Sequence, residues 1–266
     1  MSPAPARKRA DVLVCEAGLA PSRAKAQALI LAGEVFADGA RVDKPGDLLA
    51  PTSRLSVVPR RRFVSRGGEK LDGAIDLLGD AAPPIEGAVA VDVGASTGGF
   101  TDCLLQRGAR RVFAVDVGWG QLDARLRSDP RVVVRERTNA RSLRREDFGE
   151  PIDLVVVDAS FIGLDKLVPA IARVLPEGGL LLALVKPQFE AGRDAVRRGR
   201  GVIRDEDERA RAIDGARRAC EGAGFVIRRE VDSPLRGPKG NLERFILATR
   251  AADPPGPGPE HRADDA

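Results

Sequence analysis

The stretch VDVGASTGGFTD, Val91 to Asp102, contains the pattern that decides the fold of this chain. It begins as an apolar strand, passes through a turn of small residues and continues as a helix. Gly94 lets the chain turn sharply after the strand, and the small residues that follow allow a ligand to approach the backbone. Gly94, Ser96 and Gly99 stand where a dinucleotide-binding domain has three glycines, so the stretch departs from that pattern.

The same alternation of strands and helices extends from Ala88 to Arg250. Near-continuous apolar strands separated by helices are typical of a parallel sheet that is covered on both faces. We therefore predict an α/β fold with a mostly parallel, seven-stranded, Rossmann-like sheet, whose ligands bind beyond the C-terminal ends of the strands. The segments expected to contain the strands are AVAVDVGAS, RVFAVDVG, RVVVRERTN, IDLVVVDASF, LLLALVKPQF, FVIRREVDS and NLERFILATR.

Polar side chains stand at the ends of four successive predicted strands. Asp92 ends the first strand, Asp116 the second and Asp158 the fourth, and Asn139 follows the third. A carboxylate in the position of Asp116 can accept hydrogen bonds from both hydroxyls of a ribose. An acidic rim favours a small cationic cofactor over a pyrophosphate. A nicotinamide-binding domain and a scaffold that binds no ligand remain the alternatives at this point.

Two lysines and two acids are expected near the same edge of the sheet. Lys186 follows the fifth strand directly, before a proline that prevents simple continuation of the strand. Asp158 lies beside it if the fourth and fifth strands are neighbours. Glu243 begins the last strand, and its start reaches the same edge if that strand is antiparallel. Lys70 opens a helix, where the helix dipole mildly disfavours a cation.

The residue inventory limits the possible chemistry. The only histidine is His261, in a Pro/Gly-rich tail expected to be disordered, and there is no tyrosine. A Ser-His-Asp hydrolase is therefore excluded, and acid–base chemistry must use Lys, Asp, Glu, Cys or the backbone. Three widely separated cysteines without a CxxC pair argue against disulfides and against a metal site. No apolar run approaches the roughly 20 residues of a membrane span, and the N-terminus lacks a signal-peptide core, so we expect a cytoplasmic protein without a membrane partner.

Residues 7–58 form a separate pattern of two helices, a hairpin around Asp38-Gly39 and a last short strand. This part is too small and too poor in acid–base groups for an enzyme. Residues 1–70 carry 13 lysines and arginines against 7 acids, while the rest of the chain has a net charge of −2. Such asymmetry favours a polyanionic partner such as RNA, although a solubilising basic surface is the alternative.

Residues 7–58 resemble an S4 domain, a small RNA-binding module, in Ser22-Arg23, Gly33, Gly39 and Lys44-Pro45. The whole chain is similar to the hemolysin A family of rRNA ribose 2′-O-methyltransferases. The matching motifs are FVSRGGEKL, DVGASTGGFTD, AVDVGWGQLD, RERTNAR, VVDASFI, LVKPQFE and PLRGPKGNLERF. Lys70, Asp158, Lys186 and Glu243 resemble, in this order, the Lys-Asp-Lys-Glu tetrad of FtsJ-type enzymes.

The resemblance implies an S-adenosylmethionine-dependent class I methyltransferase domain behind an S4-like domain. It implies transfer to cytidine ribose in 16S or 23S rRNA, with ribosomal RNA or subunits as partners and no obligate protein partner. The expected division is 1–59 S4-like domain, 60–68 basic linker, 69–250 methyltransferase domain and 251–266 disordered tail. Candidate cofactor residues are Asp92, Gly94, Ser96, Thr97, Gly98, Gly99, Phe100, Asp116, Val117, Asn139 and Asp158. Candidate RNA-binding residues are Arg23, Lys25, Arg41, Lys44, Arg60, Arg61, Arg62, Arg66, Arg236 and Lys239.

In the expected chemistry the 2′-oxygen loses its proton as it attacks the methyl group. Lys186 can be the base only if its pKa falls from about 10.4 toward neutrality, which a neighbouring Lys70 cation and partial burial would favour. Asp158 and Glu243 would then orient the lysines, and Lys70 would position the ribose or stabilise the oxyanion. The alternatives are a non-catalytic RNA-binding protein with a degenerate methyltransferase fold, a nicotinamide oxidoreductase and a membrane pore, for which no spanning segment is present.

Overall fold

The computed structural model of the chain describes residues 6–58, 62–191 and 201–252. The chain divides into two compact units, Met1–Arg62 and Phe63–Ala266, which are described separately below. Arg60, Arg61 and the tail that contains His261 lie outside the described residues.

The first unit packs two helices against short strands, as the sequence predicts. Ser22 begins the second helix, and its side chain accepts a hydrogen bond from the backbone N–H of Lys25. Asp38 and Gly39 both have positive φ, 51° and 83°, which is the backbone that a tight two-residue hairpin turn requires. The elements are β1 (Lys8–Arg9), α1 (Ala10–Glu16), α2 (Arg23–Leu31), β2 (Val35–Ala37), β3 (Ala40–Arg41), β4 (Leu48–Leu49) and β5 (Leu55–Val57). Strands β3, β2 and β5 form one sheet, and β1 pairs with β4.

A seven-stranded sheet forms the centre of the second unit, with strand order β11-β12-β10-β9-β6-β7-β8. β12 alone is antiparallel to its neighbours β10 and β11, which confirms the predicted mostly parallel sheet with a returning last strand. The strands are β6 (Val89–Val93), β7 (Arg111–Val115), β8 (Val132–Arg135), β9 (Leu154–Val157), β10 (Leu180–Val185), β11 (Phe225–Asp232) and β12 (Arg244–Arg250).

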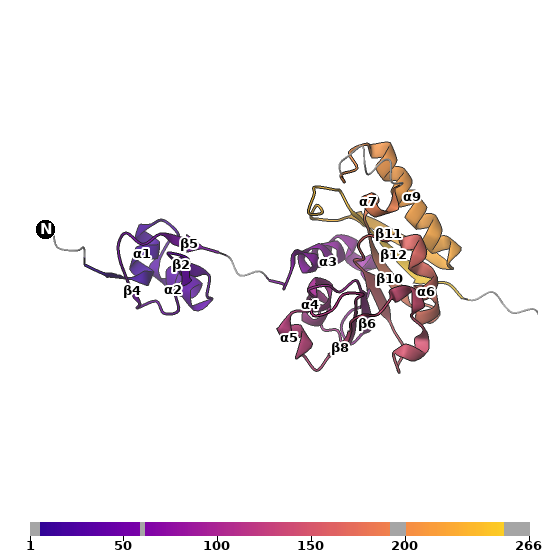
Figure 1. The fold of residues 1–266 in the computed structure, drawn as a ribbon, viewed down its shortest axis with the longest axis horizontal. Helices are drawn as coiled ribbons and strands as arrows, with labels where there is room; N and C mark the ends of the chain where they lie inside the picture. The colour runs from indigo at the N-terminus through magenta and orange to yellow at the C-terminus, as the bar shows by residue number, and fades with distance from the viewer. Residues whose placement is uncertain (1–5, 59–61, 192–200, 253–266) are drawn as a thin grey trace, which may run out of the picture. The chain divides into compact units, whose positions relative to one another are not determined.

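Helices cover both faces of this sheet and bury two apolar clusters (Figure 1). One face is covered by α3 (Arg66–Leu78), α4 (Gly99–Gln106) and α5 (Ala124–Arg127), which pack on the core around Leu71, Leu104 and Leu126. The other is covered by α6 (Val168–Val174) and α9 (Glu206–Gly222), around Ile171 and Ile213. The short elements are α7 (Pro187–Glu190), η1 (Gly79–Ala81), η2 (Ala140–Ser142), η3 (Arg145–Asp147) and η4 (Leu164–Lys166).

The segment Phe63–Gly68 belongs to the second unit and not to a linker. Phe63 is buried in the same cluster as α3 and α4. A Cβ at Gly68 would lie 2.3 Å from the Phe63 ring and 2.9 Å from the Gly99 carbonyl oxygen, so only glycine fits there. The sequence assigned residues 60–68 to the linker because arginines and glycines are typical of one. The structure instead packs residues from Phe63 onward against the turn before α4.

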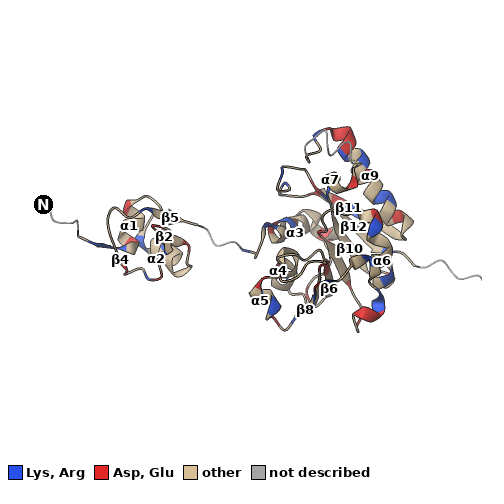
Figure 2. Ribbon diagram, in the orientation of Figure 1, with Lys and Arg blue, Asp and Glu red and all other residues tan. Residues whose placement is uncertain are grey.

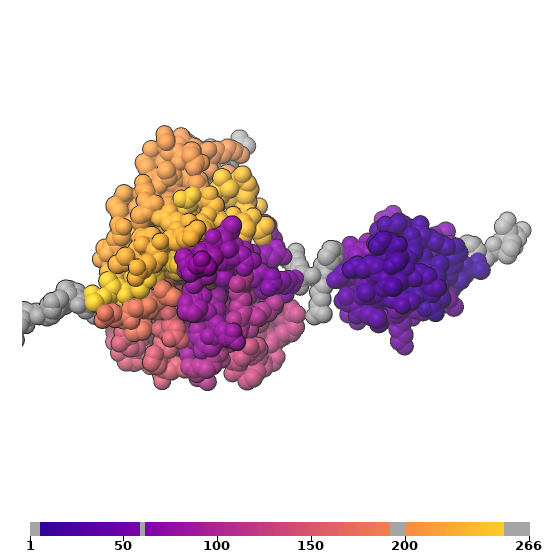
Figure 3. All heavy atoms as spheres, turned by 180° about the vertical axis from the view of Figure 1, so that it is seen from behind, coloured from indigo at the N-terminus to yellow at the C-terminus, as the bar shows by residue number. Residues whose placement is uncertain are grey.

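Helix α3 also lies beside the last part of the sheet. A Cβ at Gly73 would approach Pro234 to 2.7 Å, so the helix and the loop after β11 are in close contact. The surface of α3 adjoins that of residues 225–250 in the space-filling view (Figure 3). This packing places the start of α3 close to the start of β12.

Candidate active site

The turn between β6 and α4 is shaped by left-handed backbone. Gly94, Ser96 and Gly98 have φ of 86°, 50° and 96°. A Cβ at Gly94 would lie 3.0 Å from backbone atoms of Ala159, so the glycine also allows β6 and the end of β9 to approach closely. Ser96 and Thr97 are exposed, whereas Gly98 and Gly99 are buried. The turn therefore offers Ser96 and Thr97 to a ligand.

Asp92 is buried at the end of β6, directly below this turn. Its Oδ2 accepts hydrogen bonds from the Thr101 N–H at 2.9 Å and the Thr101 hydroxyl at 2.7 Å. Its Oδ1 has no hydrogen-bond partner among the described residues. Burial, with Asp158 and Asp116 nearby, raises the pKa of Asp92 to about 7, while the Thr101 hydrogen bonds oppose the rise. An unpartnered buried carboxylate oxygen is suited to a donor or a cation that arrives with a ligand.

Asp116 follows β7 and closes the turn from the other side. Its Oδ2 accepts the Ser96 N–H at 2.8 Å, and its Oδ1 accepts the Gly118 N–H at 2.7 Å. Val117 is 72% exposed beside it. The Asn139 side chain caps η2 by accepting the Arg141 N–H at 3.1 Å. These residues stand at the ends of neighbouring strands, as the sequence predicts.

Phe100, one of the predicted cofactor residues, has a buried side chain. Its side chain is 2% exposed and stacks on Phe245, with 6.0 Å between ring centroids. An aromatic residue in the first turn of a helix that packs on a sheet points into the core. The Phe100 ring therefore contributes to packing between α4 and β12.

Lys186 and Asp158 form an ion pair where β10 and β9 end. The Lys186 Nζ lies 2.7 Å from the Asp158 Oδ1, and it donates to the Ser160 hydroxyl at 2.9 Å. The Lys186 side chain is 9% exposed and the Asp158 side chain 22%. β9 and β10 are parallel neighbours, so the register of the sheet makes this pair possible.

Lys70 and Glu243 form a second, deeper pair. The Lys70 Nζ lies 2.5 Å from the Glu243 Oε2, with side-chain exposures of 8% and 1%. Lys70 begins the second turn of α3, and Glu243 precedes β12, whose first residue Arg244 pairs with Val185. The sequence expects the two acids to orient the two lysines, and the structure gives each lysine its own carboxylate.

The two ion pairs are joined by the start of α3. A Cβ at Gly67 would lie 3.6 Å from the Asp158 Oδ2, so the first turn of the helix contacts the carboxylate of the first pair. Lys70, one helical turn later, forms the second pair. The structure thus brings together all four members of the tetrad that the sequence singled out, beside the turn after β6.

Two family profiles match this chain over nearly its whole described length. The profile of FtsJ-like methyltransferases matches residues 63–251, and that of S4 domains matches residues 8–55. The chain belongs to the FtsJ-like methyltransferase family. The buried lysine–acid pairs and the glycine turn therefore lie within the methyltransferase domain of a member of this family.

Curated relatives cover most of the chain at high identity. A Mycobacterium tuberculosis protein named 16S/23S rRNA (cytidine-2′-O)-methyltransferase TlyA is 46% identical over 249 residues, which are 93% of this chain and 91% of the relative. Hemolysin A of Brachyspira hyodysenteriae is 42% identical, over 90% of this chain and 100% of the relative. A solved structure named as a hemolysin of Streptococcus thermophilus has 38% identity and a TM-score of 0.70, and the match covers 94% of this chain and 90% of that one.

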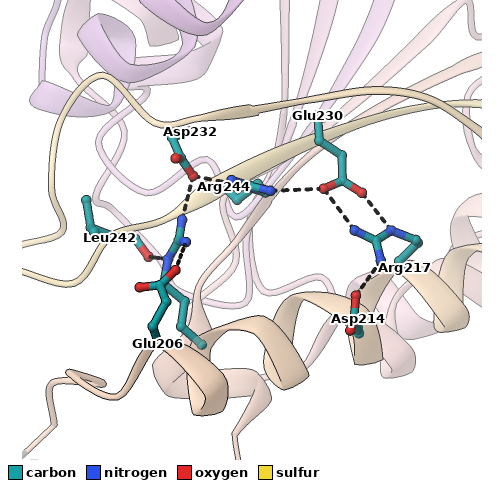
Figure 4. Close-up of polar contacts among 8 residues, drawn as sticks. Glu206, Asp214, Arg217, Glu230, Asp232, Leu242 and Arg244 are labelled. Carbon is teal, nitrogen blue, oxygen red and sulfur yellow. Dashed lines mark hydrogen bonds and ion pairs between the residues drawn. The ribbon is translucent and has the colours of Figure 1, made fainter.

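In this family member a network of ion pairs holds the strand that carries Glu243. Arg244 contacts Asp232 at 3.0 Å and Glu230 at 3.4 Å, and both acids also contact arginines of α9 (Figure 4). One of these, Arg209, lies 2.5 Å from Asp232 and donates to the Leu242 carbonyl. The network fixes the start of β12 to α9 and therefore limits the positions open to Glu243.

Lysines and arginines, the candidates for RNA contacts, occur in both units (Figure 2). In the methyltransferase unit the Arg66 guanidinium donates to the Arg236 carbonyl, so these two predicted residues lie together, and both are exposed, as is Lys239. In the first unit the predicted residues Arg23, Lys25, Arg41 and Lys44 are exposed. Arg62 is exposed too, whereas Arg60 and Arg61 lie outside the described residues.

Several partners in the site were not predicted. Thr101 holds Asp92, Ser160 holds Lys186, and Glu190 accepts the Leu164 N–H at 2.8 Å and so ties the loop after β9 to α7. Burial raises the pKa of Glu190 to about 7. The motifs VDASF and LVKPQFE contain Ser160 and Glu190, and polar residues directly after buried strands were the signal that could have identified them.

Among the residues that the structure describes, no helix has the length and the apolar character that crossing a membrane requires.

Proposed function

We propose that this chain transfers a methyl group from S-adenosylmethionine to the ribose 2′-hydroxyl of cytidine in 16S or 23S rRNA. The observation that carries the proposal is the pair of buried lysine–carboxylate contacts beside the β6–α4 turn. The names of the M. tuberculosis relatives supply the nucleotide and the two rRNA classes. Residues 6–58, 62–191 and 201–252 contain no histidine, which fits a site that uses lysine for proton transfer.

The residues at the ends of β6 and β7 fit S-adenosylmethionine. Asp92 has a buried oxygen without a partner among the described residues, and Asp116 closes the turn beside the exposed Ser96 and Val117. Asp116 would accept from the ribose, Asp92 would face the charged part of the cofactor, and the turn would lie along its backbone edge. When bound, S-adenosylmethionine supplies an electrophilic methyl group on a positively charged sulfur.

Lys186 is the candidate base in this proposal. It is held on one side by Asp158 and on another by Ser160, so its Nζ has a fixed position at the edge of the sheet where β9 and β10 end. Lys70, held by Glu243, would orient the ribose and stabilise negative charge on the 2′-oxygen. The main contribution to the rate would come from fixing the oxygen in line with the methyl group.

The first unit would capture the RNA. Its exposed cations suit phosphate contacts, which supply affinity without reading sequence. Ribosomal RNA or ribosomal subunits would be the partner, in the cytoplasm and without an obligate protein partner. We retain 1–59 as the S4-like RNA-binding part and 251–266 as a tail, and we place the start of the methyltransferase part at Phe63.

Mapping ribose methylation on 16S and 23S rRNA tests this function. Ribosomal subunits and free rRNA from cells that lack this protein are incubated with it and S-adenosylmethionine. A new 2′-O-methylcytidine is expected, and it should be absent when Lys186→Ala replaces the natural chain. Methylation at no position, or only on a base, would contradict the proposal.

Calorimetry with S-adenosylmethionine separates this function from a non-catalytic RNA-binding role. Binding of the cofactor is expected, with weaker binding for Asp116→Ala because the ribose contact and the closure of the turn are lost. A chain that binds RNA but not S-adenosylmethionine would support the non-catalytic alternative instead.

A further inference from the structure

Asp11, in the first turn of α1, is a buried carboxylate in the first unit. Its side chain has no exposed surface. Its two oxygens accept from Arg9 Nε and Nη2 at 3.0 Å each, from Arg23 Nη2 at 3.0 Å and from Gln27 Nε2 at 2.8 Å. Charge-assisted hydrogen bonds of this kind are stronger and more directional than neutral ones. One acid on α1 therefore fixes three side chains, of which Arg23 and Gln27 come from α2 and Arg9 from β1.

The two arginines held by Asp11 remain largely in solvent. Their side chains are 48% and 57% exposed. Arg9 donates two parallel hydrogen bonds to the carboxylate, from Nε and Nη2. Its guanidinium also lies close to Gly46, where a Cβ would be 3.3 Å from the Arg9 Nη1. Arg23 uses Nη2 on Asp11 and makes no other hydrogen bond to the described residues. The N–H groups of Arg23 that face outward are therefore available to an anion.

Other ion pairs of this unit differ from this arrangement. In the pairs Lys8–Glu16 and Arg41–Asp43 both partners are about half exposed or more, at 47% and 49% and at 61% and 62%. Such pairs leave both side chains free to move and contribute little. Only at Asp11 does a fully buried acid hold cations whose outer edges reach solvent, among the pairs of the described residues 6–58.

We propose that Asp11 is a positioning residue that presents Arg9 and Arg23 as a rigid pair of guanidinium groups to the phosphate backbone of RNA. The inference rests on the proposed RNA-binding function of this unit and deepens it. Guanidinium groups bind phosphate through paired N–H bonds, which requires a fixed orientation. A side chain that is already immobilised loses less entropy when it binds, so the acid raises affinity although its own charge repels RNA.

Loss of the charge of Asp11 and loss of the orientation that it imposes predict opposite changes in RNA affinity, so the direction of the measured change decides between them. Asp11→Asn removes one negative charge from a surface that meets a polyanion, so charge alone would tighten RNA binding. Loss of the fixed orientation would weaken it. We expect the full chain with Asp11→Asn to bind a fluorescein-labelled RNA hairpin about tenfold more weakly than the natural chain. The plot of log affinity against log salt concentration should become less steep, by the amount that corresponds to about one to two phosphate contacts.

Asp43→Asn is the matched control. It removes the same charge from the same unit, but from the exposed pair with Arg41. It should leave affinity unchanged or increase it. Binding by Asp11→Asn that equals or exceeds that of the natural chain would overturn the inference. Failure of the natural chain to bind the hairpin would instead refute the proposed RNA-binding function.

A second variant decides the question if Asp11→Asn unfolds the first unit, which hydrogen exchange over α1 and α2 would reveal. Arg9→Lys with Arg23→Lys keeps every charge and leaves Asp11 with cationic partners. An ammonium cannot make the paired contact of a guanidinium, so weaker RNA binding is expected at unchanged net charge. Affinity equal to that of the natural chain would overturn the inference.

Discussion

The two units of this chain bury ionised groups in opposite ways. In the first unit the acid Asp11 is buried and its cations Arg9 and Arg23 reach solvent. In the methyltransferase unit the cations themselves are buried, with Lys70 and Lys186 only 8% and 9% exposed. An exposed cation on a buried acid is suited to binding a polyanion. A buried cation with an acid beside it is suited to acting on one atom of a bound substrate, because water does not screen its field.

Lys186→Ala should have the largest effect, because it removes the proposed base. The methyl-transfer rate should fall by about 10²- to 10⁴-fold, as is usual for loss of a general base. Lys186→Arg is the sharper variant, since arginine keeps the charge beside Asp158 but does not deprotonate. Single-turnover transfer of a labelled methyl group to rRNA measures both.

Near-natural transfer by Lys186→Arg would mean that the charge of Lys186, and not its proton, is what the site needs. Lys166→Ala is the control, because Lys166 is 63% exposed and pairs only with Asp165 on the surface. It should transfer methyl groups at the natural rate.

Variants of the Lys70–Glu243 pair distinguish its contribution to the stability of the methyltransferase unit from its contribution to methyl transfer. Lys70→Met leaves the Glu243 carboxylate buried without its cation, which should destabilise the protein by about 3–5 kcal/mol. Lys70→Met combined with Glu243→Leu removes both charges and should recover most of that free energy of unfolding. Neither variant should methylate rRNA. Urea unfolding followed by circular dichroism measures the first effect and methyl transfer the second.

A double variant that is as unstable as Lys70→Met would show that the pair contributes net stability. A double variant that methylates RNA would show that the pair only supports the fold. Either result would contradict the proposed difference between the two units, in which exposed cations bind RNA and buried cations act in methyl transfer.

The two units should respond to pH in opposite directions. Hydrogen bonding to Arg9 lowers the pKa of Asp11 well below its usual range, so its contribution to stability is complete above the unfolded pKa of about 3.9 and is lost as the pH falls below it. Burial raises the pKa of Asp92 to about 7, so its contribution is complete below about 3.9 and is lost as the pH rises through about 7. Burial also raises the pKa of Glu190 to about 7, so its contribution to stability is likewise lost as the pH rises.

Hydrogen exchange, corrected for the intrinsic rate at each pH, measures the two units within the full chain. Protection of the methyltransferase unit should decline from about pH 5 to pH 7, and Asp92→Asn should make that decline shallower. Protection of the first unit should stay constant over the same range. A methyltransferase unit that gains protection toward pH 7 would contradict the assignment.

Lys25→Ala should have the smallest effect. Lys25 is exposed and forms no ion pair within the described residues, so it can contribute one phosphate contact but no fixed geometry. RNA affinity should fall by a few-fold and the salt slope by about 1, equally for all RNA sequences. A loss as large as that of Asp11→Asn would mean that fixed orientation has no special value on this surface.

The sequence was sufficient for those parts of the fold that depend on local pattern. The strand–turn–helix from Val91 to Asp102, the hairpin at Asp38-Gly39 and the four polar strand ends follow from residue type and spacing. The antiparallel last strand, which places Glu243 at the same edge as Lys186, follows from the chain order. The tetrad was therefore predicted as a set, on the pattern and on the family resemblance together.

Partners that depend on side-chain direction were not predicted. The position of Asp158 beside Lys186 was expected from neighbouring strands. The pairing of Lys70 with Glu243 is decided by the path of α3, and that path depends on close backbone contacts that no local pattern records. The stacking of Phe100 on Phe245 was not predicted, because the position of Phe100 in the turn motif gives no information on which way its ring points. Asp11 was overlooked because an acid in the first turn of a helix is ordinarily a solvated residue that interacts with the dipole.

The close contact between Gly68 and Gly99 limits how the parts of such proteins can be exchanged. A hybrid that joins a different RNA-binding module at Glu69 would keep Lys70, Asp158, Lys186 and Glu243. It would lose Phe63, which packs on Gly68, and the Ser65 hydroxyl, which lies where a side chain of residue 99 would be. The start of α3 would then have no fixed place against the β6–α4 turn. A functional junction must lie before Phe63, so residues 63–68 have to be inherited with the methyltransferase domain.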